Sequence, residues 1–512
     1  MSTTMNQSSP LIAAILASLL VSAGCSLAPT YKVPAAANPP AFKETMAMTP
    51  EEAGTWKQAR PSEDLARGEW WKIFDDPQLN EFEMRALAAN QNLKAAAARL
   101  KEARALQRVV DSAQYPTLDA GFGPTRQQYS PGSLGFQNGP SPGAQTVWRA
   151  EASVGYEIDL FGRVASTVAA ARADTQRSEA LFRSVQLALQ GDVAQNYFNL
   201  RELDSELEVF NRTVELRSQA LDFVQHRFDA GDVSDLDVAQ AKAELSSAKS
   251  DAMSVARQRA ATEHSLAVLL GKAPAEVTVA ADPLTPIVVV IPPGLPSSLL
   301  ERRPDVAAAE RAMAAENARI GVAKAAFFPS LTITGTGGTE SAKLSDLFKW
   351  SSRAFLLGPL SGTALNLPIF DGGKRKGELA NARARYEENV ASYRQQVLVA
   401  FQEVEDNLAN LRILKDQTVV QGDSVNAYAR AAQLSRTQYE DGSVNYLDVI
   451  ETERTLLQAR RAAVQLEGAR AVSTVNLVRA LGGGWDDMPI RGGTRVAAAS
   501  SDVPAAERNE VH

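Results

Sequence analysis

One phrase of this sequence occurs twice, as Arg227-Phe228-Asp229-Ala230-Gly231-Asp232-Val233 and as Gln438-Tyr439-Glu440-Asp441-Gly442-Ser443-Val444. Both copies are followed by Leu-Asp-Val, at 236–238 and 447–449, and the two copies are 211 residues apart. Further landmarks repeat in the same order at nearly the same offset: Leu-Gly at 270–271 and 481–482, Tyr-Pro-Thr-Leu at 115–118 with Phe-Pro-Ser-Leu at 328–331, and Asp-Leu-Phe-Gly-Arg at 159–163 with Pro-Ile-Phe-Asp-Gly-Gly-Lys at 368–374. Self-similarity at one fixed period indicates repeated structure. We therefore predict an internal duplication whose two halves share one fold.

Each copy of the repeated phrase lies within a long stretch without proline, the first at 162–272 and the second at 373–487. A helix over 164–229 would be about 100 Å long at 1.5 Å per residue. A shorter amphipathic helix is predicted over 87–111, where apolar residues recur every three or four positions before Pro116. The stripes of these helices are rich in alanine, which favours close, coiled-coil-like packing.

A strand of alternating character precedes the first long helix. Its even positions are apolar: Trp148, Ala150, Ala152, Val154, Tyr156, Ile158 and Leu160. Its odd positions include Arg149, Glu151, Glu157 and Asp159, so one face of the strand is apolar and the other is charged. A soluble sandwich would bury the apolar face against a second sheet. In a membrane barrel that face contacts lipid, and Trp148 and Tyr156 are then candidates for the aromatic residues at the membrane interface.

Weaker partner strands are predicted near 118–128, 331–336 and 353–368. About four spanning strands cannot close a barrel, since bacterial barrels have at least about eight, and open sheet edges are not tolerated in lipid. The chain is therefore expected to form its membrane part as an oligomer.

The N-terminus predicts export and a lipid anchor. The apolar run at 11–21 is too short to span a membrane and is typical of a signal-peptide core. It leads into Val21-Ser22-Ala23-Gly24-Cys25, in which small residues precede the only cysteine of the chain. We predict a signal peptide at 1–24, acylation of Cys25, and a lipid-anchored tether at 25–75; an ordinary free or buried cysteine is the alternative.

Composition excludes several other classes of protein. A net charge of -7 with pI about 5.4 gives no basic surface for nucleic acid. The three histidines, His226, His264 and His512, are scattered, and no metal-ligand spacing or catalytic motif is present. We expect no enzymatic activity, no metal, no nucleic-acid partner and no cofactor beyond the covalent lipid on Cys25.

Three phrases carry a resemblance to a known family: residues 291–305, Trp70-Trp71 with 74–79, and residues 480–485. In these phrases the chain resembles the TolC-like outer-membrane channels, and in particular their OprM/NodT lipoprotein branch. The resemblance implies an α+β membrane protein and a homotrimer, in which about four strands per chain form a shared outer-membrane β-barrel continued by a long periplasmic α-helical barrel. It divides the chain into a first repeat at 76–290, a second repeat at 291–485 and a disordered tail at 486–512.

The resemblance also implies a function. Such channels are passive conduits of tripartite efflux systems, which export drugs or other small solutes across the outer membrane. They are opened at their periplasmic tip by a periplasmic membrane-fusion adaptor and an inner-membrane RND-type pump. The alternatives are a channel of a type I protein secretion system and, in a different class, a periplasmic coiled-coil scaffold or adaptor lipoprotein.

The family implies roles for residues near the repeated phrase. Leu447, Asp448 and Glu451 match the apolar and acidic rings that close the mouth. Tyr439 and Asp237 match a pair that ties neighbouring helices in the closed state, while Val444 stands where TolC itself has an arginine. Gly231 and Gly442 match the turns on which the adaptor docks. The alternative for the carboxylates is that they lie on a solvated helix face. Each glycine can also be a helix C-cap, which is compatible with adaptor docking at the same turn.

Overall fold

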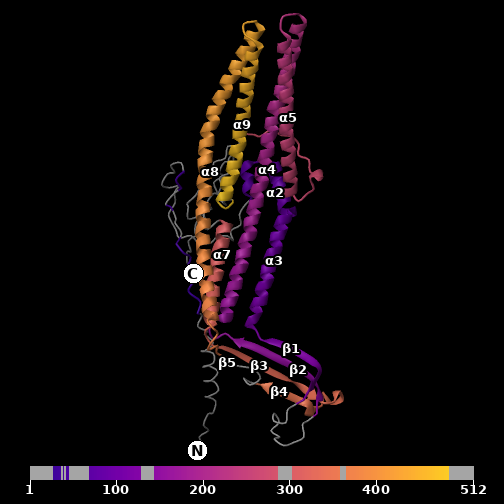
Figure 1. Cartoon of the computed structure of the whole chain (residues 1–512), viewed down its shortest axis with the longest axis vertical. Coiled ribbons are helices and arrows are strands. Elements are labelled where there is room, and N and C mark those ends of the chain that lie inside the picture. The colour runs from indigo at the N-terminus through magenta and orange to yellow at the C-terminus, as the bar shows by residue number, and fades with distance from the viewer. Residues whose placement is uncertain are drawn as a thin grey trace, which may run out of the picture.

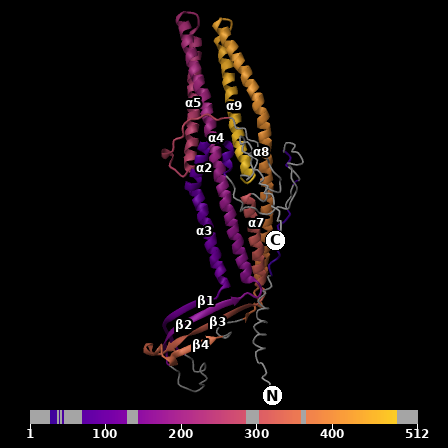
Figure 2. The ribbon, with the colours of Figure 1, turned by 180° about the vertical axis from the view of Figure 1, so that it is seen from behind.

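The computed structural model describes residues 27–35, 39, 42–44, 69–128, 143–285, 303–357 and 365–483. The protein is elongated, with a small sheet at one end and two helical hairpins that end in tight turns at the other (Figure 1). The opposite view has the same arrangement (Figure 2). The predicted signal peptide, Cys25, most of the tether, most of the 291–305 phrase and the C-terminal tail lie outside the described residues.

Two pairs of helices of matched length confirm the predicted duplication. Helices α4 (Arg163–Asp229) and α8 (Lys374–Glu440) have 67 residues each, and α5 (Asp235–Leu269) and α9 (Tyr446–Ala480) have 35 each. A helix of 67 residues is about 100 Å long. Both long helices follow a glycine of positive φ, Gly162 at 72° and Gly373 at 95°, a conformation that L side chains rarely adopt.

Shorter helices pack beside these pairs: η1 (Trp70–Phe74), α2 (Pro77–Ala89), α3 (Gln91–Asp111), η2 (Ser112–Gln114), η4 (Pro274–Glu276) and α7 (Pro304–Ala325). The predicted helix over 87–111 was wrong at its start, because the chain breaks at Asn90 between α2 and α3. The Asn90 side chain accepts a hydrogen bond from the Leu93 N–H at 3.0 Å and donates one to the Leu269 carbonyl at 2.9 Å. This cap stabilises a new helix start that the apolar spacing cannot reveal.

The sheet is antiparallel in the order β1 (Thr117–Gln127), β2 (Gln145–Ile158), β3 (Ser330–Ser341) and β4 (Arg353–Leu357), and β5 (Leu365–Asn366) also pairs with β3. Strand β3 is longer than the predicted 331–336, and the predicted 353–368 contains two short strands. Strands of the first and second halves meet where β2 pairs with β3.

The alternating pattern of β2 extends across the sheet. On one face the Trp148 ring lies 6.1 Å from the Phe122 ring of β1. On the other face the Arg149 guanidinium lies 3.3 Å from the Glu340 carboxylate of β3. The separation into an apolar and a charged face, predicted from one strand, is therefore a property of neighbouring strands as well.

The main core lies among the helices, away from the sheet. It combines Trp70 and Trp71 with Tyr197 and Phe198 of α4 and with residues of α7, α8 and α9. One buried carboxylate beside it has two cationic partners: Asp204 lies 3.0 Å from Arg201 and 2.5 Å from Arg259. In the described part of the chain, no helix combines the length and the apolar character that a membrane crossing requires.

Candidate functional site

The two helical hairpins end in turns of the same geometry. Gly231 has φ 82° and Gly442 has φ 74°, and a Cβ atom on either glycine would meet no other atom within 4 Å. The N–H of the residue after each glycine donates to a carbonyl five residues back: Asp232 to Arg227 at 2.9 Å, and Ser443 to Gln438 at 2.8 Å. These are Schellman-type C-caps, so backbone conformation, not crowding, requires the glycines. The open space around them leaves both turns accessible.

A carboxylate starts the helix that follows each turn. The Asp237 carboxylate accepts hydrogen bonds from the Ser234 N–H at 3.0 Å and hydroxyl at 2.9 Å, and the Asp448 carboxylate accepts one from the Asn445 N–H at 3.1 Å. Each pair forms a capping box. Asp237 and Asp448 therefore have a local structural role in addition to the roles that the resemblance implies.

The predicted ring residues share the exposed face of the first turns of α9. Leu447 is 55% exposed, and Asp448 and Glu451 are also exposed. The opposite face of α9 is buried, where Tyr446, Val449 and Ile450 form a small apolar cluster with Val224, Ala241 and Tyr439. The structure thus brings the three ring residues together and directs them away from their own chain.

The tie between Tyr439 and Asp237 that the resemblance implies is not a hydrogen bond among the described residues. The Asp237 carboxylate caps α5, and the buried Tyr439 hydroxyl has no hydrogen-bond partner among the described residues. Burial raises the pKa of Tyr439, and it raises the pKa of the neighbouring Tyr446 to about 12. Both rings are therefore neutral near pH 7.

Arg227 provides the contact between the hairpins that we did not predict. Its guanidinium carbon lies 5.1 Å from the centre of the Tyr439 ring, and its Nη1 donates to the Tyr439 carbonyl at 3.4 Å. A cation placed over an aromatic face is attracted by the ring quadrupole. Arg227 opens the first copy of the repeated phrase, where the second copy has Gln438, and this difference between the copies was the available signal.

A second contact between the hairpins lies further from the tip. The buried Glu244 carboxylate of α5 lies 3.1 Å from the Arg217 guanidinium of α4 and also pairs with Arg454 of α9. Nearby, Arg461 of α9 pairs with the buried Glu206 of α4. These ion pairs join the first hairpin to the second by charges that lie hundreds of positions apart in sequence.

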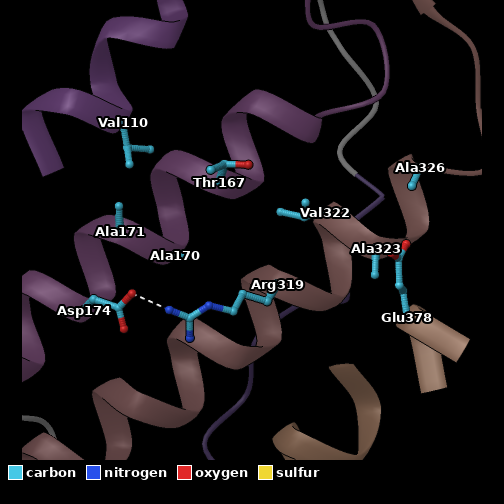
Figure 3. A pocket seen from close by; sticks show the side chains of 10 residues that line it. All are labelled: Val110, Thr167, Ala170, Ala171, Asp174, Arg319, Val322, Ala323, Ala326 and Glu378. Carbon is cyan, nitrogen blue, oxygen red and sulfur yellow. Dashed lines mark hydrogen bonds and ion pairs between the residues drawn. The ribbon is translucent and has the colours of Figure 1, made fainter. Parts of the chain in front are cut away.

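A pocket of about 430 Å³ lies near the sheet end of the helices (Figure 3). It is lined by α3, α4, α7 and α8, chiefly by alanine and valine, and the Asp174–Arg319 ion pair of 2.5 Å crosses it. Its polar lining residues are Thr167, Asp174, Arg319 and Glu378. Within the described ranges, no three His, Cys, Asp or Glu side chains are grouped to hold a metal ion.

Comparison with known proteins gives a consistent result. A family model described as "Outer membrane efflux protein" matches residues 84–272 and 295–483, one segment in each half of the chain. The chain is 34% identical over 466 residues to the toluene efflux pump outer membrane protein TtgF of Pseudomonas putida, covering 91% of this chain and 95% of that protein. It is also 34% identical over 469 residues to the cation efflux system protein CusC of an Escherichia coli O6:H1 strain, covering 90% of this chain and 96% of that protein.

A solved structure has the same fold. The outer-membrane channel OprN superimposes with a TM-score of 0.79 at 29% sequence identity, covering 90% of this chain and all of that one. The predicted α+β fold class, with its short sheet and long helices, is thereby confirmed.

Proposed function

This chain belongs to the outer membrane efflux protein family and is an outer-membrane channel of an efflux system, and from that premise we propose that it works as a homotrimeric passive conduit gated at the tip of its helical hairpins. The relatives are named as efflux components, which favours this function over type I secretion and over an adaptor. The observation that carries the proposal is the exposed face of α9, where no helix of the described residues covers Leu447, Asp448 and Glu451.

The trimer is supported by the edges of the sheet. Among the described residues, strands β1 and β4 each pair on one side only, which leaves two edges of the sheet open. Backbone groups at an open edge cannot remain unpaired in lipid, so the sheet must close with other copies. Three copies bring twelve strands, β1 to β4 of each copy, which are enough for a closed barrel.

The gate is proposed to be held by two kinds of contact. Around the axis, Leu447 of three copies forms an apolar constriction, with Asp448 and Glu451 as acidic rings. Within each chain, Arg227 and Arg454 hold the second hairpin against the first. A shift of α8 and α9 outward would break these contacts and open the mouth.

A periplasmic membrane-fusion adaptor and an inner-membrane RND-type pump are the proposed partners, with the turns at Gly231 and Gly442 as docking points. These turns are the parts of the described chain farthest from the sheet (Figure 1). The cargo is proposed to be a drug or other small solute, selected by the pump. The channel itself performs no reaction in this scheme.

A lipid anchor on Cys25 is supported by the path of the residues that follow it. The Pro29 carbonyl accepts a hydrogen bond from the Asn317 side chain at 2.8 Å, and the Tyr31 hydroxyl donates to the Glu310 carbonyl at 3.3 Å. Ala28 packs beside Gly321, one turn before α7 ends at the sheet. The chain thus approaches the membrane end of α7 as it runs back toward Cys25, and three extended residues span about 10 Å.

Native mass spectrometry of the detergent-extracted protein tests the trimer. We expect a complex of three chains. A stable, folded monomer as the principal species would refute the proposed assembly.

A further inference from the structure

The pocket of Figure 3 lies over the seam between α4 and α7. Helix α3 packs beside α4, and α8 packs beside α7, so the four helices form one layer. Both outer helices reach the pocket, α3 through Val110 and α8 through Glu378. A layer whose outer helices line a pocket over its middle helices is curved toward that pocket. The pocket therefore lies on the concave face of the layer.

The N-terminal segment lies against a different side of α7. Asn317 and Gly321 are four residues apart and so share one side of the helix. The Asn317 side chain donates to the Pro29 carbonyl, and Gly321 packs against Ala28. The pocket residue Ala323 is two positions after Gly321, which is about half a turn around the helix. The pocket and the N-terminal segment are therefore on opposite faces of the helical layer.

These two observations agree on which face is the inner one. In a closed ring of copies, the concave face of each curved layer is directed toward the axis. The segment that leads to the proposed lipid anchor on Cys25 belongs on the outer face, because the membrane surrounds the barrel. Both arguments place the pocket in the wall of the conduit, between the sheet and the gate.

The wall of the pocket is mostly apolar, with alanine and valine side chains from α3, α4 and α7. Its volume of about 430 Å³ is within the range of about 300 to 1,000 Å³ that is typical of small-molecule sites. Ala171 of α4 and Val322 of α7 are half-buried and line the pocket from its two sides. Such a wall favours a ligand with an apolar body.

The charged side chains at the pocket have an excess of carboxylates. Arg319 is shared by two acids, since it lies 2.5 Å from the Asp174 carboxylate and 2.6 Å from the Glu316 carboxylate. The second oxygen of Glu316 is buried and has no hydrogen-bond partner among the described residues. Glu378 has a long contact of 3.9 Å with Lys374. Three carboxylates thus face two cations, which favours a positively charged ligand over an anion.

We propose that this pocket is a binding site, in the wall of the conduit, for an organic cation with an apolar body, such as a quaternary ammonium ion that carries alkyl chains. The alkyl chains lie against Ala171, Val322 and Ala323, and the positive centre lies on the acidic rim near Asp174 and Glu378. The inference rests on the proposed function and adds a chemical class of solute that the conduit itself binds. The site lies on the sheet side of the gate, so its occupation does not require the gate to open.

Protection of a cysteine introduced into the pocket tests this site. Ala323→Cys is made in the full chain, the purified trimer is treated with N-ethylmaleimide, and the rate of modification is followed by mass spectrometry. The wild type, whose only cysteine is Cys25, gives the background. We expect tetrabutylammonium to slow the modification, whereas tetramethylammonium, which has the same charge without the apolar body, should not. Ala326→Cys is the second position, in case Ala323→Cys does not assemble.

Charge variants in the Ala323→Cys background test the acidic rim. Asp174→Asn should raise the tetrabutylammonium concentration that gives half protection by about fivefold, the effect of one partly exposed charge contact. Arg319→Gln should lower that concentration, because Asp174 and Glu316 both lose their cationic partner. Asp251→Asn is the matched control, since it removes one exposed charge from α5, which does not line the pocket, and it should change nothing.

Three results would overturn the site: cysteines at 323 and 326 that are not modified in the folded trimer, equal protection by the two ammonium ions, or an equal shift in Asp174→Asn and Asp251→Asn. The first would place the pocket away from the lumen, and the other two would leave only a general effect of charge. In each case the channel function stands if the same protein is a trimer by native mass spectrometry and conducts ions. Protein that neither forms a trimer nor conducts would contradict the proposed function itself.

Discussion

Asp448 combines two tasks at the residue scale. Its carboxylate caps the start of α9 through the Asn445 N–H, and it also lies on the exposed face with Leu447 and Glu451. Three copies of Asp448 and Glu451 would bring six carboxylates to one axis, where like charges repel and attract cations. The capping role constrains which substitution can test the ring.

Asp448→Asn with Glu451→Gln should therefore weaken the preference of the pore for cations, since the charge is removed while the asparagine oxygen can still cap α9. The measurement is the reversal potential in a KCl gradient across a planar bilayer, which should move toward zero. Asp237→Asn is the matched control, because Asp237 caps α5 in the same way outside the proposed ring. An unchanged reversal potential in the double variant would place the selectivity elsewhere.

Glu83 is a buried acid that the sequence did not single out. It is 0% exposed on α2, and neither carboxylate oxygen has a partner among the described residues. Burial raises its pKa to about 9 from an ordinary value of 4.5. The folded chain therefore binds a proton at this position between about pH 4.5 and 9 that the unfolded chain releases, so stability falls as pH rises through this range.

Glu83→Gln should remove this pH dependence. Each unit of pKa shift corresponds to about 1.4 kcal/mol, so the variant should gain thermal stability over the wild type at pH 8 and gain little at pH 5. Thermal unfolding followed by circular dichroism measures the difference, with the exposed Glu81→Gln as control. Equal gains at both pH values would contradict a buried, protonated Glu83.

The tip glycines were predictable at this scale because the phrase that contains them is repeated. The contacts of Arg227 and Glu83 were not predictable, although the difference between Arg227 and Gln438 in the two copies marked the first position. Arg227 acts through a ring from the other half of the chain, and Glu83 lies beside Phe82 and one turn from Leu79 and Ala86, on a face whose burial depends on packing against α4. The spacing of residues within one segment does not predict which residues of distant segments they will contact.

At the scale of elements, the ion pairs around Glu244 connect three helices. Arg217 of α4 and Glu244 of α5 are almost fully buried, whereas the Arg454 side chain of α9 is 59% exposed. Arg217 neutralises Glu244 within the first hairpin, and its removal would leave the buried carboxylate with the largely exposed Arg454 as its one ion-pair partner among the described residues. Arg454 adds the connection to the second hairpin and is an exposed partner, worth less than about 1 kcal/mol.

Arg454→Gln should loosen the gate without unfolding the protein. We expect a larger or more frequent open state in single-channel recordings, together with a melting temperature close to that of the wild type. Arg470→Gln serves as control, because Arg470 pairs with Glu467 within α9 and not with the other hairpin. The role of the Arg454–Glu244 pair in closing the gate is disproved if the single-channel recordings of the two variants have the same open states.

The lengths of the long helices could be read from the sequence because proline-free runs and the repeat period define both ends; the predicted 164–229 differs from α4 by one residue. The break at Asn90 could not be read from the sequence, since a side-chain cap decides it. The short strands β4 and β5 could not be read either, since their pairing with β3 decides them. The contacts between the hairpins depend on the tertiary arrangement, so the spacing of apolar residues along the sequence does not predict them.

At the scale of the whole molecule, the N-terminal segment links the membrane end to the middle of the helices. The Glu405 carboxylate of α8 accepts hydrogen bonds from the Lys43 N–H at 2.6 Å and the Glu44 N–H at 3.0 Å, and Phe42 packs on Phe401 with ring centroids 6.3 Å apart. A lipid on Cys25 would thus hold one end of a segment whose described residues contact α7 and α8.

Mass spectrometry of the mature N-terminus tests the anchor: we expect the chain to begin at an acylated Cys25. Cys25→Ser should reduce the amount delivered to the outer membrane more than it reduces folding of the delivered fraction, because the sheet also inserts. An N-terminus at another residue, or an unmodified Cys25, would overturn the lipid anchor and leave the channel function intact.

Ion current through the purified wild-type protein in a planar bilayer tests the central claim most directly. A trimeric conduit closed at its acidic tip predicts discrete, small current steps that carry cations in preference to anions. Protein that is recovered from the bilayer as an inserted trimer, yet never raises the current above the baseline, would contradict the account.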